Sequence, residues 1–149
     1  MIKHTLVFLM LSAPVLAQQP QEKHYTVDTS GTPREVKVGD KGSLSIVITP
    51  SAGKKVHDQA PLVVSLKGSK GVALAKNKLG HSDVANKGDK APQIKAEFTA
   101  REPGEQTVDA DMQFFICTDK WCERMTEKVK VTLNVVPADA APAPTPAPK

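Results

Sequence analysis

The chain has 149 residues, with 20 lysines and arginines against 16 aspartates and glutamates, so its formal net charge is +4. The charge is small and the lysines alternate with acids, which argues against a nucleic-acid-binding surface. No stretch after the N-terminal segment is apolar enough for a transmembrane helix, so we do not expect the protein to span a membrane. Because only 4% of the residues are aromatic, the core must consist mainly of Val, Leu, Ile and Ala.

Residues 1–17 have the pattern of a cleavable secretory signal peptide. Lys3 and His4 precede a short apolar segment, and small residues lead to a cleavage site predicted after Ala17. The apolar segment is too short to cross a bilayer, and no cysteine follows Ala17 that would carry a lipid anchor. We therefore expect a periplasmic or secreted protein, whose charge without Lys3 is 19 minus 16, or +3.

The mature chain divides into a leader, one domain and a tail. Residues 18–30 are polar and predict a flexible leader, with a short edge strand at Tyr25 and Val27 as the alternative. Residues 31–137 form a single predicted domain, since about 110 residues are enough for one modest core. Residues 138–149 are mostly alanine and proline and predict a disordered tail, because such a sequence cannot bury a core.

Apolar and polar residues alternate with a period of two within the predicted domain. Clusters of Gly, Pro, Asp and Asn separate the alternating segments. Each segment therefore has one apolar face and one wet face, as expected of strands that cover a shared core. No window predicts a helix. The fold class expected is all-β, an immunoglobulin-like antiparallel β-sandwich. The alternating segments are residues 43–49, 62–67, 94–99, 108–116 and 128–135.

The two cysteines of the chain, Cys117 and Cys122, lie in its most aromatic stretch. In an oxidising compartment a pair of cysteines forms a disulfide by default. If the strand that ends near Cys117 pairs with the strand that begins near Met125, the cysteines face each other at a hairpin tip. The closed loop is about six residues, for which chain entropy predicts roughly 2 kcal/mol of stabilisation. The bond is therefore either a modest structural staple or a redox site.

Aromatic residues beside the cysteines are candidates for core and for contact surface. Phe114 is in phase with the apolar face of its strand, which predicts a core position. Phe115 is out of phase and Trp121 lies in the turn, so we expect both to be exposed and to form a possible docking surface.

The sulfur atoms of the same region suggest one further hypothesis, a copper(I) site. Met112, Cys117, Cys122 and Met125 are soft ligands of the kind that copper(I) prefers. Met112, however, is in phase with the core face, and an oxidising compartment favours a disulfide over two thiolates. The sequence therefore predicts neither a metal nor a cofactor. The histidines are scattered, and His57 is assigned to a surface loop.

Several segments of the chain resemble the N-terminal periplasmic domain of the thiol–disulfide reductase DsbD. That domain is immunoglobulin-like, and its redox cysteines lie on two neighbouring strands near its C-terminal end. The resemblance covers most of the predicted domain, and its motifs are short. The similar segments, in order, are Ile46–Pro50, Gly53–His57, Phe98–Gly104, Met112–Cys122 and Thr126–Val135.

The resemblance implies a redox function for the cysteines. Cys117 and Cys122 would then form a redox-active disulfide that exchanges electrons with a partner, either a thioredoxin-like protein or a membrane thiol–disulfide protein. The alternative is a non-enzymatic extracytoplasmic binding or structural domain whose disulfide only staples a hairpin. Whether the protein is an enzyme stays open between these hypotheses.

Overall fold

The computed structural model describes residues 23–139, so the predicted signal peptide, the first part of the leader and tail residues 140–149 lie outside the described residues. Within residues 23–139 the regular helical structure is one 3-10 turn, η1 (His81–Asp83), and no helix is long and apolar enough to cross a membrane. The strands are β1 (Tyr25–Asp28), β2 (Glu35–Lys37), β3 (Lys41–Pro50), β4 (Lys55–Val56), β5 (Val63–Gly68), β6 (Val72–Leu74), β7 (Lys78–Leu79), β8 (Gln93–Ala100), β9 (Gly104–Cys117) and β10 (Cys122–Val136).

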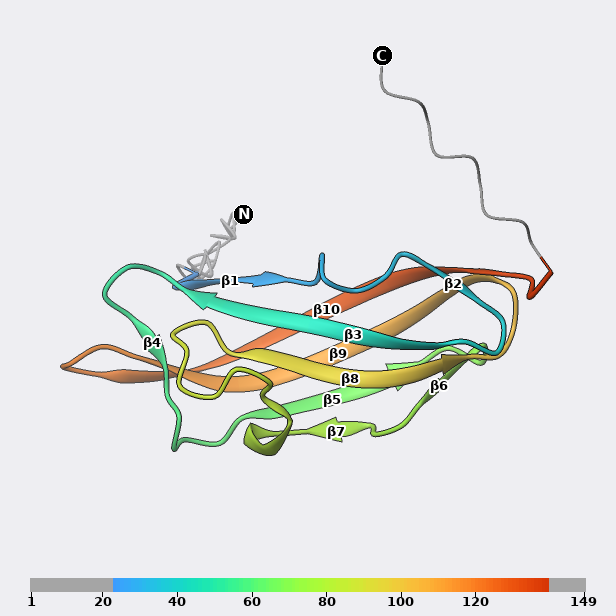
Figure 1. Cartoon of the computed structure of the whole chain (residues 1–149). Helices are drawn as coiled ribbons and strands as arrows, with labels where there is room; N and C mark the ends of the chain where they lie inside the picture. Colours follow the sequence, from blue (N-terminus) through green and yellow to red (C-terminus); the bar gives the residue numbers. More distant parts are fainter. Residues whose placement is uncertain (1–22, 140–149) are drawn as a thin grey trace, which may run out of the picture.

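The strands form two sheets packed face to face (Figure 1). The first sheet has the order β1-β3-β8-β6, and the second has the order β2-β10-β9-β5-β7, with β4 also pairing with β9. All strand pairs are antiparallel except β2 with β10, which is parallel. The predicted all-β, immunoglobulin-like sandwich is confirmed, with this one parallel pair added.

The core lies between the sheets and follows the alternation seen in the sequence. Every predicted segment overlaps one long strand, namely β3, β5, β8, β9 or β10. Phe98 of β8 and Phe114 of β9 are its largest fully buried side chains. Aliphatic residues fill the remaining volume, as expected for a chain with few aromatics. They include Leu44, Ile46, Ile48, Val64, Ile94, Val108, Met112, Ile116, Leu133 and Val135.

The segment predicted to be a flexible leader contains the first strand, β1. Tyr25 is buried, and its ring meets that of Phe114 edge to face at a centroid distance of 4.9 Å. Its hydroxyl group also donates a 2.7 Å hydrogen bond to Glu127. The alternative of a short edge strand at Tyr25 and Val27 is therefore the one observed. These tertiary contacts order a segment too short to show a periodic pattern.

The turn after β5, at residues 67–71, contains two glycines but does not form a β-hairpin. The chain crosses here from the second sheet to the first, because β5 pairs with β9 whereas β6 pairs with β8. Gln106 holds this corner: its Oε1 accepts hydrogen bonds from the Ser69 hydroxyl at 2.6 Å and from the Gly71 N–H at 3.2 Å. A single side chain on β9 thus fixes a link that local sequence could not distinguish from a hairpin.

Candidate functional site

Strands β9 and β10 form a long hairpin that carries the cysteines at its tip. Their register runs from Gly104 opposite Val135 to Cys117 opposite Cys122. Figure 1 shows the tip of this orange and red hairpin extending past the ends of the neighbouring strands. The turn between the two cysteines therefore projects from the body of the sandwich.

The disulfide joins directly opposed residues, as predicted. Cys117 and Cys122 are bonded to each other, their Cα atoms are 4.1 Å apart, and no other cysteine is present. The next pair outward is hydrogen-bonded, because the Thr118 N–H donates to the Trp121 carbonyl at 2.8 Å. The cysteines therefore occupy a non-hydrogen-bonded pair, where opposed side chains come closest.

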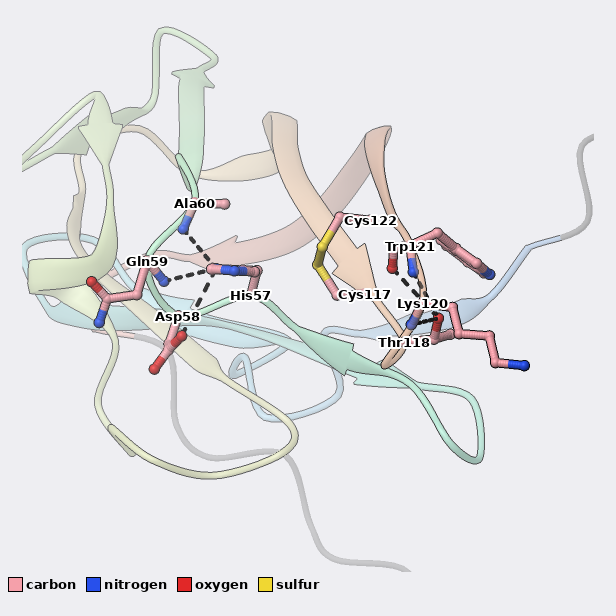
Figure 2. Close-up of a disulfide and its surroundings, with 9 residues drawn as sticks. All are labelled: His57, Asp58, Gln59, Ala60, Cys117, Thr118, Lys120, Trp121 and Cys122. Atoms are coloured by element: carbon pink, nitrogen blue, oxygen red, sulfur yellow. Dashed lines mark hydrogen bonds and ion pairs between the residues drawn. A yellow bond between two sulfur atoms is a disulfide. The ribbon is translucent and has the colours of Figure 1, made fainter.

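The turn beyond the disulfide is ordered by Thr118. Its hydroxyl oxygen accepts hydrogen bonds from the N–H groups of Lys120 and Trp121, both at 3.2 Å (Figure 2). A threonine hydroxyl used in this way replaces backbone partners that a tight turn leaves unsatisfied. The disulfide and the Thr118 hydroxyl together fix the position of Trp121.

The two cysteines differ sharply in their accessibility. Cys117 is only 1% exposed, whereas Cys122 is exposed. Strand β4 causes the difference, since Lys55 lies opposite Cys117 on the side of β9 away from β10. A large molecule that approaches from solvent would meet Cys122 first.

The aromatic side chains of this region fall into three environments. Phe114 is fully buried, as predicted. Trp121 is 40% exposed and is the one exposed large hydrophobic side chain within residues 23–139; its ring lies 5.6 Å from that of His24. Phe115 is half-buried and not freely exposed as expected, because β4 covers this part of β9. Trp121 is therefore the stronger candidate for a contact residue.

His57, which the sequence assigned to a surface loop, lies beside the disulfide. Its N–H donates to the Phe115 carbonyl at 2.9 Å, which continues the β4–β9 pairing by one residue. One ring nitrogen lies within 4.8 Å of the sulfur atoms of both Cys117 and Cys122. Because His57 and the cysteines are far apart in the sequence, only the pairing of β4 with β9 brings them together.

The His57 ring is held in a fixed orientation by its own loop. Nδ1 accepts hydrogen bonds from the backbone N–H groups of Gln59 at 3.0 Å and Ala60 at 2.9 Å. Asp58 places a carboxylate oxygen 3.8 Å from the same nitrogen. Figure 2 shows the imidazole between this loop and the disulfide.

His57, Cys117 and Cys122 also offer three atoms that a metal ion could use as ligands. The sulfurs are bonded to each other, so they are not the thiolates that a soft metal needs. A metal-bound histidine usually donates its second N–H to an acceptor, whereas Nδ1 of His57 faces two donors. Met112 and Met125, the other residues of the copper(I) hypothesis, are buried in the core. The arrangement suits sulfur chemistry better than metal binding.

A hollow of about 520 Å³ lies next to the buried cysteine. Cys117, Thr118 and Asp119 form one side of it, and residues 49–55 with Lys90 and Ala91 form the other. A second hollow of about 510 Å³ shares Lys55 and Lys90 with the first. The first hollow gives a partner protein space to place a side chain on the Cys117 side of the disulfide.

Hydrogen bonds and an ion pair connect Lys23 and Tyr25 to Glu127, which lies on β10 near the hairpin tip. Glu127 accepts hydrogen bonds from the Tyr25 hydroxyl and from the Lys23 ammonium group. Burial raises the pKa of the Glu127 carboxyl, but these hydrogen bonds and the charge of Lys23 outweigh burial and bring the pKa below its ordinary value. Burial, followed by the nearby carboxylate, raises the pKa of Tyr25 well above its ordinary value. The pair is therefore a charged Glu127 and a neutral Tyr25 over a wide pH range.

Comparison with known proteins gives similarity of overall shape alone. No family model matches the chain, and no curated protein matches it in sequence. Domains 4 and 5 of the S-layer protein SbsC align at 19% identity with a TM-score of 0.43, over 74% of this chain and 51% of theirs. This chain thus spans about half the length of that structure.

Two proteins of conjugative transposons are also similar in shape. A lipoprotein from Bacteroides eggerthii aligns at 8% identity with a TM-score of 0.45, over 76% of this chain and 99% of its own. A protein from Bacteroides vulgatus aligns at 11% identity with a TM-score of 0.42, over 76% of this chain and 90% of its own. At these identities and TM-scores nothing about function is transferred, so function must be argued from the hairpin tip itself.

Proposed function

We propose that this protein is an extracytoplasmic immunoglobulin-like domain that binds a partner protein through the tip of the β9–β10 hairpin. The observation that carries the proposal is Trp121, a 40% exposed tryptophan on a turn that projects from the sandwich. Tryptophan is among the residues that contribute most to protein–protein affinity. The disulfide supports the proposed location, because such bonds persist in oxidising compartments.

The tip is also rigid, which favours binding. The Cys117–Cys122 bond closes the base of the tip, and the Thr118 hydroxyl oxygen accepts a hydrogen bond from the backbone N–H of Trp121. A turn whose backbone is already fixed loses less conformational entropy when a partner covers it. In this role the disulfide acts as a staple for the contact surface.

A binding measurement tests the role of Trp121. The probe is a purified thioredoxin-like protein from the same organism, titrated calorimetrically into the wild-type chain and Trp121→Ala. We expect Trp121→Ala to weaken binding at least tenfold, in line with a hot-spot residue. The control is Thr132→Ala, since Thr132 is exposed on β10, the strand that follows Trp121, but lies toward the opposite end of the hairpin. Absence of binding by the wild type, or equal affinity in Trp121→Ala, would contradict the proposal for this partner class.

Thiol–disulfide exchange is a second candidate function, favoured by the unequal exposure of the two cysteines. A partner thiolate would attack the exposed Cys122 sulfur, forming a mixed disulfide and releasing Cys117 as a thiolate. A second partner thiol would then attack the partner's own sulfur in the mixed disulfide, which frees Cys122. Two electrons thereby pass from the partner dithiol, which becomes a disulfide, to this domain, which becomes a dithiol.

Two measurements separate exchange from a purely structural bond. The first is the reduction potential of the Cys117–Cys122 couple, for which a value below about −300 mV marks a resistant structural disulfide. The second is trapping of a mixed disulfide with a resolving-cysteine variant of the same thioredoxin-like protein, whose remaining cysteine is first converted to a disulfide with thionitrobenzoate. The thiolate of this domain then displaces thionitrobenzoate as the leaving group. Cys117→Ser should form this adduct readily through the exposed Cys122, and Cys122→Ser should form it poorly because Cys117 is buried. Equal trapping by both variants would remove the basis for the exchange candidate.

A further inference from the structure

We infer that His57 is a positioning residue for sulfur chemistry at the tip, where its imidazole N–H stabilises the Cys117 thiolate once the disulfide opens. The inference rests on the exchange candidate above and extends it to a residue outside the hairpin. It starts from the placement of one ring nitrogen within 4.8 Å of both sulfurs.

The hydrogen bonds of the ring determine its tautomer. Nδ1 accepts from two backbone N–H groups, those of Gln59 and Ala60, so Nδ1 carries the lone pair. In a neutral imidazole the hydrogen is then on Nε2. His57 is thus fixed as a donor through Nε2, the ring nitrogen that forms no hydrogen bond with its own loop. The loop that orients His57 therefore also decides its chemistry.

The environment of Cys117 makes such a donor valuable. Cys117 is 1% exposed, so a thiolate formed there would lose most of its hydration. A hydrogen bond to the charged form and a nearby cation both favour a thiolate, while burial opposes it. Lys54, Lys55 and Lys90 line the hollow beside Cys117 together with Asp119, and a carboxylate oxygen of Asp58 lies 3.8 Å from Nδ1 of His57. The nearby N–H of His57 would add a donor once the opened disulfide lets the Cys117 sulfur move into hydrogen-bonding range.

Two substitutions separate this role from the role of His57 in its loop. In His57→Asn the amide oxygen can take the place of Nδ1 and accept from the backbone N–H groups of Gln59 and Ala60, as in an Asx turn. The asparagine side chain has no group at the position of Nε2. His57→Phe removes both the acceptor and the donor. Amide hydrogen exchange at residues 59 and 60 reports whether the loop is preserved.

The decisive measurement is the pKa of the Cys117 thiol in the Cys122→Ser background, followed by the ultraviolet absorbance of the thiolate. We expect His57→Asn and His57→Phe to raise this pKa by about one unit, a tenfold loss of thiolate at neutral pH. At a pH above the thiol pKa values of both proteins, where the reduced form is the thiolate, the same change should lower the reduction potential by about 30 mV, because tenfold in this two-electron couple corresponds to that value. Loop protection should be lost in His57→Phe alone.

The possible outcomes are distinct. If His57→Asn leaves the Cys117 pKa unchanged, with or without an effect of His57→Phe, His57 serves only the loop and the inference is overturned. If both variants shift the pKa but the wild type does not exchange with a reduced thioredoxin-like protein, His57 stabilises the thiolate as inferred and the exchange candidate fails instead.

Discussion

The hydroxyl group of Tyr25 donates a 2.7 Å hydrogen bond to the carboxylate of Glu127, which joins the first strand of one sheet to the last strand of the other. Lys23 completes the contact with an ion pair of 3.0 Å to the same carboxylate. Glu127 lies on β10 between the tip and the middle of the hairpin. The start of the domain is therefore anchored next to the candidate contact surface.

The contact between Glu127, Tyr25 and Lys23 predicts how the free energy of unfolding depends on pH. The net effect of its surroundings lowers the pKa of Glu127, so the folded state favours the carboxylate. The stabilisation is present above the ordinary pKa of 4.5 and is lost as the pH falls through the lowered value in the folded state. Urea unfolding from pH 6 to pH 3 should show this loss, and Glu127→Gln should show a smaller one. If Glu127→Gln lost as much stability as the wild type between pH 6 and pH 3, the prediction would be contradicted.

Removal of the Tyr25 hydroxyl tests the same contact from its other side. Tyr25→Phe keeps the ring against Phe114 and should cost about 1–2 kcal/mol at neutral pH, as expected for a hydrogen bond to a charged acceptor. The raised pKa of Tyr25 means that its contribution is complete below pH 10 and is lost as the pH rises above it. The difference between wild type and Tyr25→Phe should therefore shrink in alkali. Equal stability at pH 7 would show that the hydroxyl contributes nothing.

Gly42 is required by the packing of Phe98. The two residues are directly opposed on β3 and β8, and a Cβ atom at Gly42 would lie 2.3 Å from Cζ of Phe98. Phe98 is 1% exposed and has little room to move. Gly42→Ala should cost about 1–3 kcal/mol in urea unfolding, the usual range for overpacking. In the Phe98→Leu background the same substitution should cost less, and strictly additive effects would show that the ring is not the cause.

Much of this structure follows from local pattern, and the rest depends on contacts distant in sequence. The alternation of Leu44, Ile46 and Ile48 is enough to predict β3, and the spacing of Cys117 and Cys122 is enough to place a disulfide at a hairpin tip. Short strands carry no such pattern. Strand β4 has two residues and forms only because β9 provides its backbone partners.

The same reasoning explains why the sequence predicts only part of the candidate site. Cys117, Cys122 and Trp121 are neighbours in the chain, so one segment shows them together. His57 reaches them through β4, and no spacing rule connects residues on strands whose pairing is unknown. The segment Pro50–Gly53, which precedes His57, suggests a turn, but a turn alone does not reveal which strand it approaches.

Thr118 should determine the stability of the turn at the tip. Its hydroxyl accepts from two backbone N–H groups, so Thr118→Val, which has a similar shape, leaves both without that acceptor. We expect a loss of about 1 kcal/mol in urea unfolding and faster amide exchange at Lys120 and Trp121. Thr118→Ser retains the hydroxyl and should keep the exchange protection. Similar protection in Thr118→Val and wild type would show that the disulfide alone orders the turn.

The disulfide itself should be a minor source of stability. It closes a loop of about six residues, so its removal in the double variant Cys117→Ser, Cys122→Ser should cost roughly 2 kcal/mol by chain entropy. The buried core and the long β9–β10 pairing remain, so the variant should fold with an unchanged circular dichroism spectrum. Because Cys117 is buried, Cys117→Ala with Cys122→Ser separates the cost of a buried hydroxyl from that of the lost bond. A loss well above 4 kcal/mol in this second variant would mean that the bond supports the whole domain, and it would weigh against a disulfide that opens during function.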